Sequence, residues 1–165
     1  MALHFILDGY NIIKSDTYAI LQKGSLEEAR EHLISFLANS RPQGSIRNLV
    51  TVVFDSHSDQ SPFDQDRFHY KASNIQVVFS RDCTADEEIE GIVRKTLNKG
   101  AIVVVTDDRG LCRLIGGFSV KRMSVSQFLN LALKSKTLRR VSNCQKVDKE
   151  TIKKIDDELT KKWLK

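Results

Sequence analysis

The stretch LHFILDGYN at residues 3–11 decides the fold class, because it is an apolar run that ends at Asp8 and Gly9. Two further runs of this kind occupy residues 49–54 and 101–106, and weaker ones occupy residues 75–80 and 119–123. Each run is almost continuously apolar, which is typical of strands buried on both faces of a parallel sheet.

Helix start signals lie between and after these runs. The capping boxes SLEE (25–28) and TADE (84–87) predict helices to about Asn39 and to Gly100, and SVSQ (124–127) opens a third. The apolar positions that we expect to face the core are Ala29, Leu33, Phe36 and Leu37 in the first helix, Ile89, Val93 and Leu97 in the second, and Phe128, Leu131 and Ala132 in the third. The order of elements predicts an α/β fold of three layers, in which helices cover both faces of a mostly parallel sheet.

Composition excludes several classes of protein. The chain has 165 residues, of which 41% are hydrophobic and 28% charged, as expected for one globular domain with a short extension. Its three cysteines (Cys83, Cys112 and Cys144) form no CxxC pair, which favours reduced thiols over disulfides or structural zinc. No apolar run approaches the roughly 18–20 residues that span a bilayer, and Asp8 comes too early for a signal peptide. We therefore expect a cytoplasmic protein without membrane contact.

Positive charge is concentrated at the end of the chain. Residues 134–165 carry a net charge of +6, whereas the rest of the chain carries −1. We divide the chain into a body at residues 1–136 and a basic extension at 137–165, in which an apolar stripe predicts one helix docked on the body. The extension is either a solvated basic helix or a contact for a polyanion, and the candidate phosphate contacts are Arg139, Arg140, Lys146, Lys153, Lys154, Lys161 and Lys162.

Carboxylates follow the predicted strands with some regularity. Asp8 and Asp55 end two strands, and Asp107 and Asp108 follow a third. Asp86 and Glu90 share one face of the helix that begins near residue 84, at the same edge of the sheet. Carboxylates that converge in this way repel one another unless a cation joins them, and oxygen ligands suit Mg²⁺ or Mn²⁺. The pattern therefore predicts a divalent-metal site.

The motifs that carry this pattern are DGYN (8–11), VFD (53–55), TAD followed by IE (84–90) and VTDDR (105–109). Together they resemble the NYN-domain ribonucleases, nearest to the YacP-like group within the PIN-like nuclease superfamily, over about residues 3–133. The extension after residue 137 has no clear counterpart in these motifs.

That resemblance implies a metal-dependent endoribonuclease that cleaves single-stranded RNA, in this group linked to mRNA on translating ribosomes. Asp8, Asp86 and Asp108 match the metal-binding acids, Asn11 the polar residue after the first of them, and Asp55 the acid of the second strand. Asp107 stands where serine is common, so either Asp107 or Asp108 is the inner ligand.

Two alternatives remain open. The order of Asp55, Thr106 and Lys121 would suit a phospho-receiver domain, and a non-catalytic RNA-binding module could keep the same acids as structural residues. The long loop at residues 56–74 holds His57 and His69, which we expect to be solvated, together with aromatic and basic side chains suited to single-stranded RNA or to packing within the loop.

Overall fold

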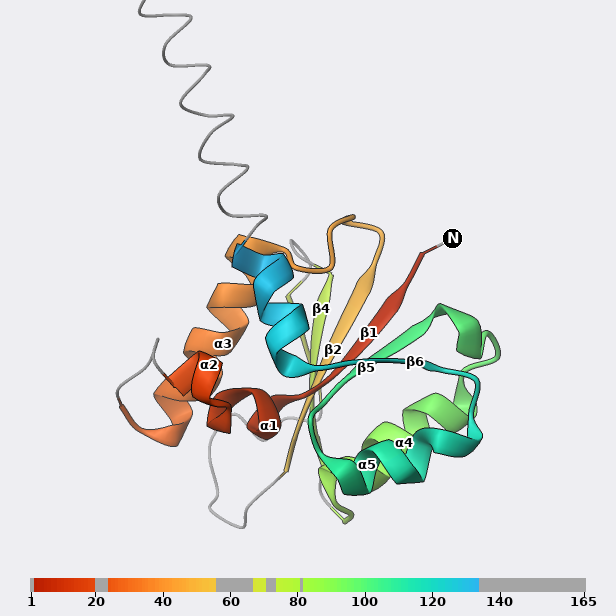
Figure 1. Cartoon of the computed structure of the whole chain (residues 1–165). Helices are drawn as coiled ribbons and strands as arrows, with labels where there is room; N and C mark the ends of the chain where they lie inside the picture. The colour runs from red at the N-terminus through yellow and green to blue at the C-terminus, as the bar shows by residue number, and fades with distance from the viewer. Residues whose placement is uncertain (1, 20–23, 56–66, 71–73, 81, 134–165) are drawn as a thin grey trace, which may run out of the picture.

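The computed structural model describes residues 2–19, 24–55, 67–70, 74–80 and 82–133 (Figure 1). Its centre is a six-stranded sheet in the order β3-β4-β2-β1-β5-β6. Five of the strands are parallel and β3 pairs antiparallel with β4 at one edge. The strands are β1 (His4–Asp8), β2 (Leu49–Asp55), β3 (Arg67–Tyr70), β4 (Ile75–Ser80), β5 (Ile102–Val105) and β6 (Lys121–Met123).

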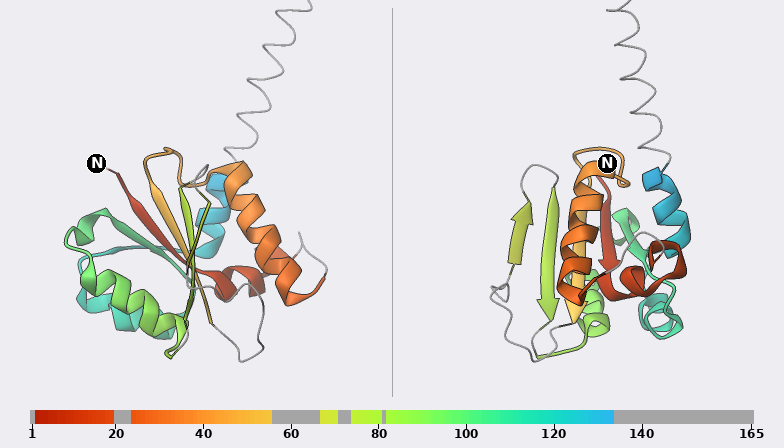
Figure 2. Two further views of the ribbon diagram at one scale, coloured as in Figure 1. Left: turned by 180° about the vertical axis from the view of Figure 1, so that it is seen from behind. Right: turned by 90° about the vertical axis from the view of Figure 1, so that its left-hand side faces the viewer.

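Helices cover both faces of this sheet, so the predicted three-layer α/β fold is confirmed (Figure 2). One face packs against α1 (Gly9–Lys14), α2 (Asp16–Ala19), α3 (Leu26–Ser40) and the helical residues 125–133. The other face packs against α4 (Ala85–Lys95) and α5 (Arg109–Leu114). Alternate residues of β1 point to opposite faces, since Phe5 and Leu7 belong to one core and Ile6 to the other. This explains the continuous apolar runs of the strands.

The register of the parallel strands brings their carboxyl ends to one edge. Asp8 lies opposite Val53, Asp55 lies opposite Ser80, and Leu7 lies opposite Val105. Counted along the chain, the parallel strands have the spatial order 3-2-1-4-5, whereas a receiver domain has 2-1-3-4-5. The phospho-receiver alternative is therefore wrong, and Lys121 lies at the start of its strand instead of at the carboxyl edge.

Both predicted capping boxes are present. The side chain of Ser25 accepts a hydrogen bond from the Glu28 amide at 3.3 Å, and that of Thr84 accepts one from the Glu87 amide at 3.2 Å. The second helix ends earlier than predicted, at Lys95 instead of Gly100. The chain turns at the Thr96 cap and leaves Leu97 fully exposed (100%) instead of in the core.

Two further predictions need correction. Leu131 is 39% exposed, whereas Leu129 is buried (2% exposed), because the buried stripe of the helix at 125–133 runs through residues 125, 128, 129 and 132; Phe128 and Ala132 are buried as predicted. Residues 67–70 within the predicted loop 56–74 form β3. His69 therefore lies in a strand and not in a loop. The remainder of that loop, with His57, and the whole of residues 134–165 lie outside the described residues, so the predictions for His57, for the solvated side chain of His69 and for the basic extension stay predictions.

Within the described part of the chain, no helix combines the length and the apolar character needed to cross a membrane.

The turn after β1 depends on a close approach between Gly9 and Phe54. Gly9 starts α1 and does not have the positive φ found at Gly24 and Gly44. A Cβ atom at Gly9 would instead overlap the ring of Phe54, which is fully buried. The absence of a side chain at residue 9 therefore lets the first turn of α1 lie directly on the end of β2.

We expect Gly9→Ala to lower the free energy of unfolding by about 1–3 kcal/mol, because the added methyl group must displace the Phe54 ring in a packed core. Urea denaturation followed by circular dichroism measures the change. Gly91→Ala is the matched control, since Gly91 lies within α4 and a Cβ there meets nothing within 4 Å. The control should raise stability by roughly 0.4–1 kcal/mol. Equal effects of the two substitutions would contradict the packing argument.

Candidate active site

Four carboxylates from separate elements lie at the carboxyl edge of the parallel strands. Asp8 ends β1, Asp55 ends β2, Asp86 lies in the first turn of α4, and Asp108 immediately precedes α5. The charge of Asp108 acts on both Asp8 and Asp86, and the charge of Asp55 acts on Asp86. These four side chains form the acidic cluster.

Backbone amides at the start of three helices hold three of the four carboxylates. Asp8 caps α1 and accepts a hydrogen bond from the Asn11 amide at 3.1 Å. Asp108 caps α5 and accepts bonds from two amides of its first turn, one of them from Leu111 at 3.1 Å. Asp55 accepts a bond from the Ala85 amide at 2.6 Å, at the start of α4. The amides fix these side chains and partly offset their negative charge.

Thr106, which follows β5, joins two members of the cluster. Its hydroxyl donates to Oδ2 of Asp8 at 3.3 Å and accepts from the Asp108 amide at 3.0 Å. The side chain of Asn11 makes a second link, because its Oδ1 accepts from the Asp107 amide at 2.9 Å. Asn11 therefore ties the first turn of α1 to the loop after β5.

The environment of Asp8 disfavours its charged form. The side chain is only 8% exposed, and burial raises its pKa from 3.8 to about 6. The negative charges of Asp86 and Asp108 also raise this pKa, while the hydrogen bonds from Asn11 and Thr106 act in the opposite direction.

Asp86 is affected in the same way. Partial burial raises its pKa first, followed by repulsion from Asp108, Asp55 and Glu87. None of the charges that shift the pKa of Asp8 or Asp86 is positive. The cluster thus receives hydrogen bonds from backbone amides. Among the described residues, no cationic side chain offsets the charge of Asp8 or Asp86.

Two of the predicted metal ligands lie apart from this cluster. The Oδ1 atom of Asp107 accepts a hydrogen bond from the Val125 amide at 3.2 Å, so Asp107 caps the helix at 125–133. Glu90 pairs with Arg94 one helical turn further along α4. Between the two adjacent acids, Asp108 is the one whose charge reaches Asp8 and Asp86.

The donor set of the acidic cluster suits a hard divalent cation. All its side-chain donors are oxygens, and their mutual repulsion would be relieved by a positive ion. Among the described residues, however, no group of three or more His, Cys, Asp or Glu side chains is placed to hold a metal ion. A site on Asp8, Asp86 and Asp108 would depend on water to complete the coordination, and Mg²⁺ tolerates such retained waters.

The family model of the YacP-like NYN domain matches residues 5–165, which is nearly the whole chain. The chain belongs to the YacP-like NYN family. None of the curated proteins matches it significantly.

Two crystal structures of Rae1 (YacP) from Bacillus subtilis are similar to this YacP-like NYN domain. A point variant of Rae1 is 28% identical with a TM-score of 0.66, over 90% of this chain and 85% of that chain. A second Rae1 structure is 26% identical with a TM-score of 0.64, over 99% of this chain and 92% of that chain.

Membership of this family supports a nuclease-like, RNA-related function. The family match also runs through residue 165. The basic extension is thus included in what the YacP-like NYN family shares, although the motifs read from the sequence end near residue 133.

The sequence predicts that Tyr10 packs under the site, but sequence reasoning missed Arg30, which supports the DGYN turn of this YacP-like NYN domain. Arg30 of α3 donates from Nε to the hydroxyl of Tyr10 at 2.9 Å, and its guanidinium lies 5.4 Å from the centre of the Tyr10 ring. Tyr10 is buried and meets Phe54 edge to face, with ring centres 5.3 Å apart. Tyr10 therefore packs against the end of β2, next to the turn that carries Asp8. The contact between Tyr10 and Arg30 joins two helices, and no local sequence pattern indicates it.

We expect Asp8→Asn to stabilise the metal-free protein in a way that depends on pH. Because the pKa of Asp8 is raised from 3.8 to about 6 in the folded state, the folded wild type retains a proton that the unfolded chain releases between about pH 4 and 6. The free energy of unfolding of the wild type thus falls as the pH rises through this window. The variant should exceed the wild type by up to about 3 kcal/mol above pH 6 and should lose this advantage near pH 4.

Denaturation in EDTA at several pH values measures this difference. Asp16→Asn is the matched control, since Asp16 is exposed on α2 and is not part of the acidic cluster. A stability gain for Asp8→Asn that does not change with pH would contradict the explanation.

Proposed function

We propose that this protein is a metal-dependent endoribonuclease that cleaves single-stranded RNA at the acidic cluster. The observation that carries the proposal is the convergence of Asp8, Asp55, Asp86 and Asp108 from four elements, with raised pKa values at Asp8 and Asp86. Such an arrangement costs stability in the free protein, so its retention is explained best by a cation and an anionic substrate. Membership of the YacP-like NYN family supports RNA as that substrate.

The residues proposed to hold Mg²⁺ or Mn²⁺ are Asp8, Asp86 and Asp108. When bound, the ion would supply positive charge for the phosphate and lower the pKa of a bound water. No hydrogen bond among the described residues occupies the carboxylate of Asp86. Among the members of the cluster, the carboxylate of Asp86 is therefore the most open to an ion or to a water.

Asn11 and Asp55 have different proposed roles. Because Oδ1 of Asn11 accepts from the Asp107 amide, the Nδ2 group remains as a donor for a phosphate oxygen. Asp55 is bonded to the Ala85 amide and to the hydroxyl of Ser80 at 3.4 Å. It holds the start of α4, and with it Asp86, against the end of β2.

We expect Asp86→Asn and Asp8→Asn each to reduce RNA cleavage by at least about 100-fold, since each removes a charge that would bind the ion or accept a proton. Cleavage of a fluorescent single-stranded RNA in Mg²⁺ or Mn²⁺ measures this. Mn²⁺ should also raise the melting temperature of the wild type but not of Asp8→Asn, because the ion binds only the folded site.

Asp16→Asn serves again as the control and should cleave like the wild type. Near-normal turnover of either cluster variant would contradict the proposed site. If the wild type binds RNA but does not cleave it in either metal, the alternative of a non-catalytic RNA-binding module is correct.

We further propose that the basic extension attracts RNA, including mRNA on ribosomes as the family resemblance implies. Replacing Lys153, Lys154, Lys161 and Lys162 with Gln should weaken RNA binding. The slope of log affinity against log salt concentration should become shallower by about 0.7 for each phosphate that is no longer neutralised. Fluorescence anisotropy between low and moderate salt measures both, and sedimentation with ribosomes tests the second partner. An unchanged slope would show that these lysines are solvated and do not bind phosphates.

A further inference from the structure

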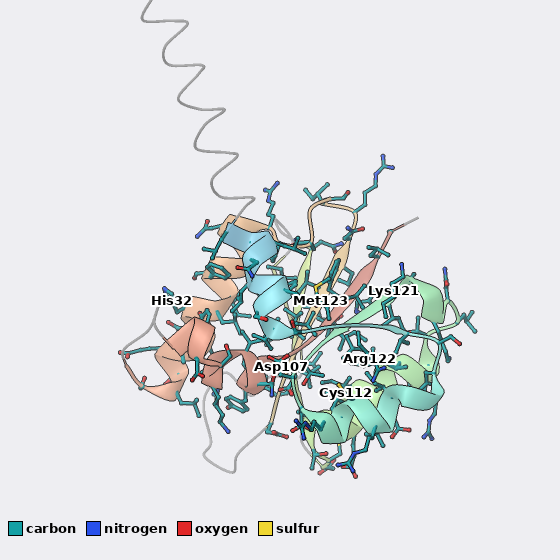
Figure 3. The ribbon with its side chains drawn as sticks, in the orientation of Figure 1. His32, Asp107, Cys112, Lys121, Arg122 and Met123 are labelled. Atoms are coloured by element: carbon teal, nitrogen blue, oxygen red, sulfur yellow. The ribbon has the colours of Figure 1, made fainter. Side chains whose placement is uncertain are left out.

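A pocket of about 570 Å³ lies beside the acidic cluster, between the end of β5, α5 and β6. Val120 lines it from the face of the sheet that carries α4 and α5, and Arg122 and Ser124 are among its polar residues, whereas the side chain of Met123 packs with the core of the other face. The volume lies within the range of roughly 300–1,000 Å³ that is usual for small-molecule sites. Figure 3 shows Asp107, Cys112 and Arg122 on this side of the molecule, away from His32 on α3.

The pocket and the acidic cluster share a wall. Thr106 lines the pocket, and its hydroxyl is the group that bonds Asp8. Asp107 also lines the pocket, and its backbone amide is the group that bonds Asn11. Only Thr106 and Asp107 therefore separate the pocket from Asp8 and Asn11, so an RNA strand bound across the cluster would also reach the pocket.

Charge in the pocket suits a phosphate that carries an organic group. Arg122 is exposed and forms no ion pair with any described carboxylate, so its guanidinium is available to an anion. Among the described residues that line the pocket, Asp107 is the one acid, and the Val125 amide already occupies its Oδ1. The second oxygen of Asp107 is an acceptor for a sugar hydroxyl or a base N–H.

We propose that this pocket binds the nucleotide next to the cleaved phosphodiester bond, an inference that rests on the proposed endoribonuclease function. Arg122 contacts the phosphate of that nucleotide. The sugar or the base packs against Val120, and the second oxygen of Asp107 accepts a hydrogen bond from it. The pocket thereby sets which side of the cluster the RNA occupies.

The first test measures binding without cleavage. A labelled single-stranded oligoribonucleotide is titrated with the full-length protein in EDTA, and binding is followed by fluorescence anisotropy. Arg122→Ala should weaken binding about 5- to 20-fold and reduce the salt slope by about 0.7, because the variant lacks one charge-assisted hydrogen bond to a phosphate. Arg122→Lys should recover part of the affinity.

Arg47→Ala is the matched control, because Arg47 is an exposed arginine in the loop before β2, at the amino ends of the parallel strands and thus far from the cluster. It should bind RNA within about twofold of the wild type. Equal losses for Arg47→Ala and Arg122→Ala would overturn the proposal, since they would show a general effect of charge.

Cys112 supplies a second test that a general loss of affinity would not reproduce. Its thiol is partly exposed and lines the pocket. Saturating oligoribonucleotide should slow alkylation of Cys112 by iodoacetamide at least about fivefold, as measured by mass spectrometry of the Cys112 peptide. Inorganic phosphate at the same concentration should give no protection, and protection by phosphate alone would show a simple anion site instead.

The outcomes separate the two proposals. If RNA is cleaved but Cys112 stays unprotected and Arg122→Ala binds normally, the pocket proposal fails and the proposed function stands. If RNA protects Cys112 and binds through Arg122 without being cleaved in Mg²⁺ or Mn²⁺, the nuclease proposal fails and the pocket remains an RNA site.

Discussion

Repulsion among four carboxylates at one edge of the sheet is the constraint around which this structure is arranged. Burial and the neighbouring negative charges both raise the pKa of Asp8 and Asp86, and both cost stability. The fold reduces that cost by starting three helices at the acids, so that amides of α1, α4 and α5 bond Asp8, Asp55 and Asp108. Backbone groups thus offset the negative charge of the site only in part. This is the physical reason to expect a cation there.

Packing behind the cluster keeps that arrangement in place. The bare backbone of Gly9 lets α1 rest on the Phe54 ring, and Tyr10 fills the space beside it. Arg30 then fixes Tyr10 from α3, a helix on the face of the sheet opposite to α4. Residues far from Asp8 in the sequence therefore decide where its carboxylate lies.

Positive charge is placed around the cluster and not within it. Arg30 and Lys14 lie over the Tyr10 ring on one side, and Arg122 lines the pocket on the other. The body as a whole is nearly neutral, and residues 134–165, which include the basic extension, carry a net +6. This distribution suits a polyanion that flanking cations hold beside the acids, where a metal ion would offset the negative charge of the cluster.

The sequence by itself determined the layers of the fold and most of the acidic cluster. Continuous apolar runs predicted buried parallel strands, the capping boxes predicted the starts of α3 and α4, and the strand-end rule predicted that Asp8, Asp55, Asp86 and Asp108 would meet. These features are local patterns, or follow from the direction of parallel strands, so they can be read along the chain.

Tertiary structure decided the rest. The short helices α1 and α5 have no apolar period to reveal them, and β3 is a strand only because β4 pairs with it. The separate uses of Asp107 and Asp108 depend on which backbone amide each carboxylate meets, Val125 in one case and Leu111 in the other. Adjacent acids look alike in a sequence, and only the folded chain, by placing one helix start beside each of them, assigns one to the cluster and the other to the pocket.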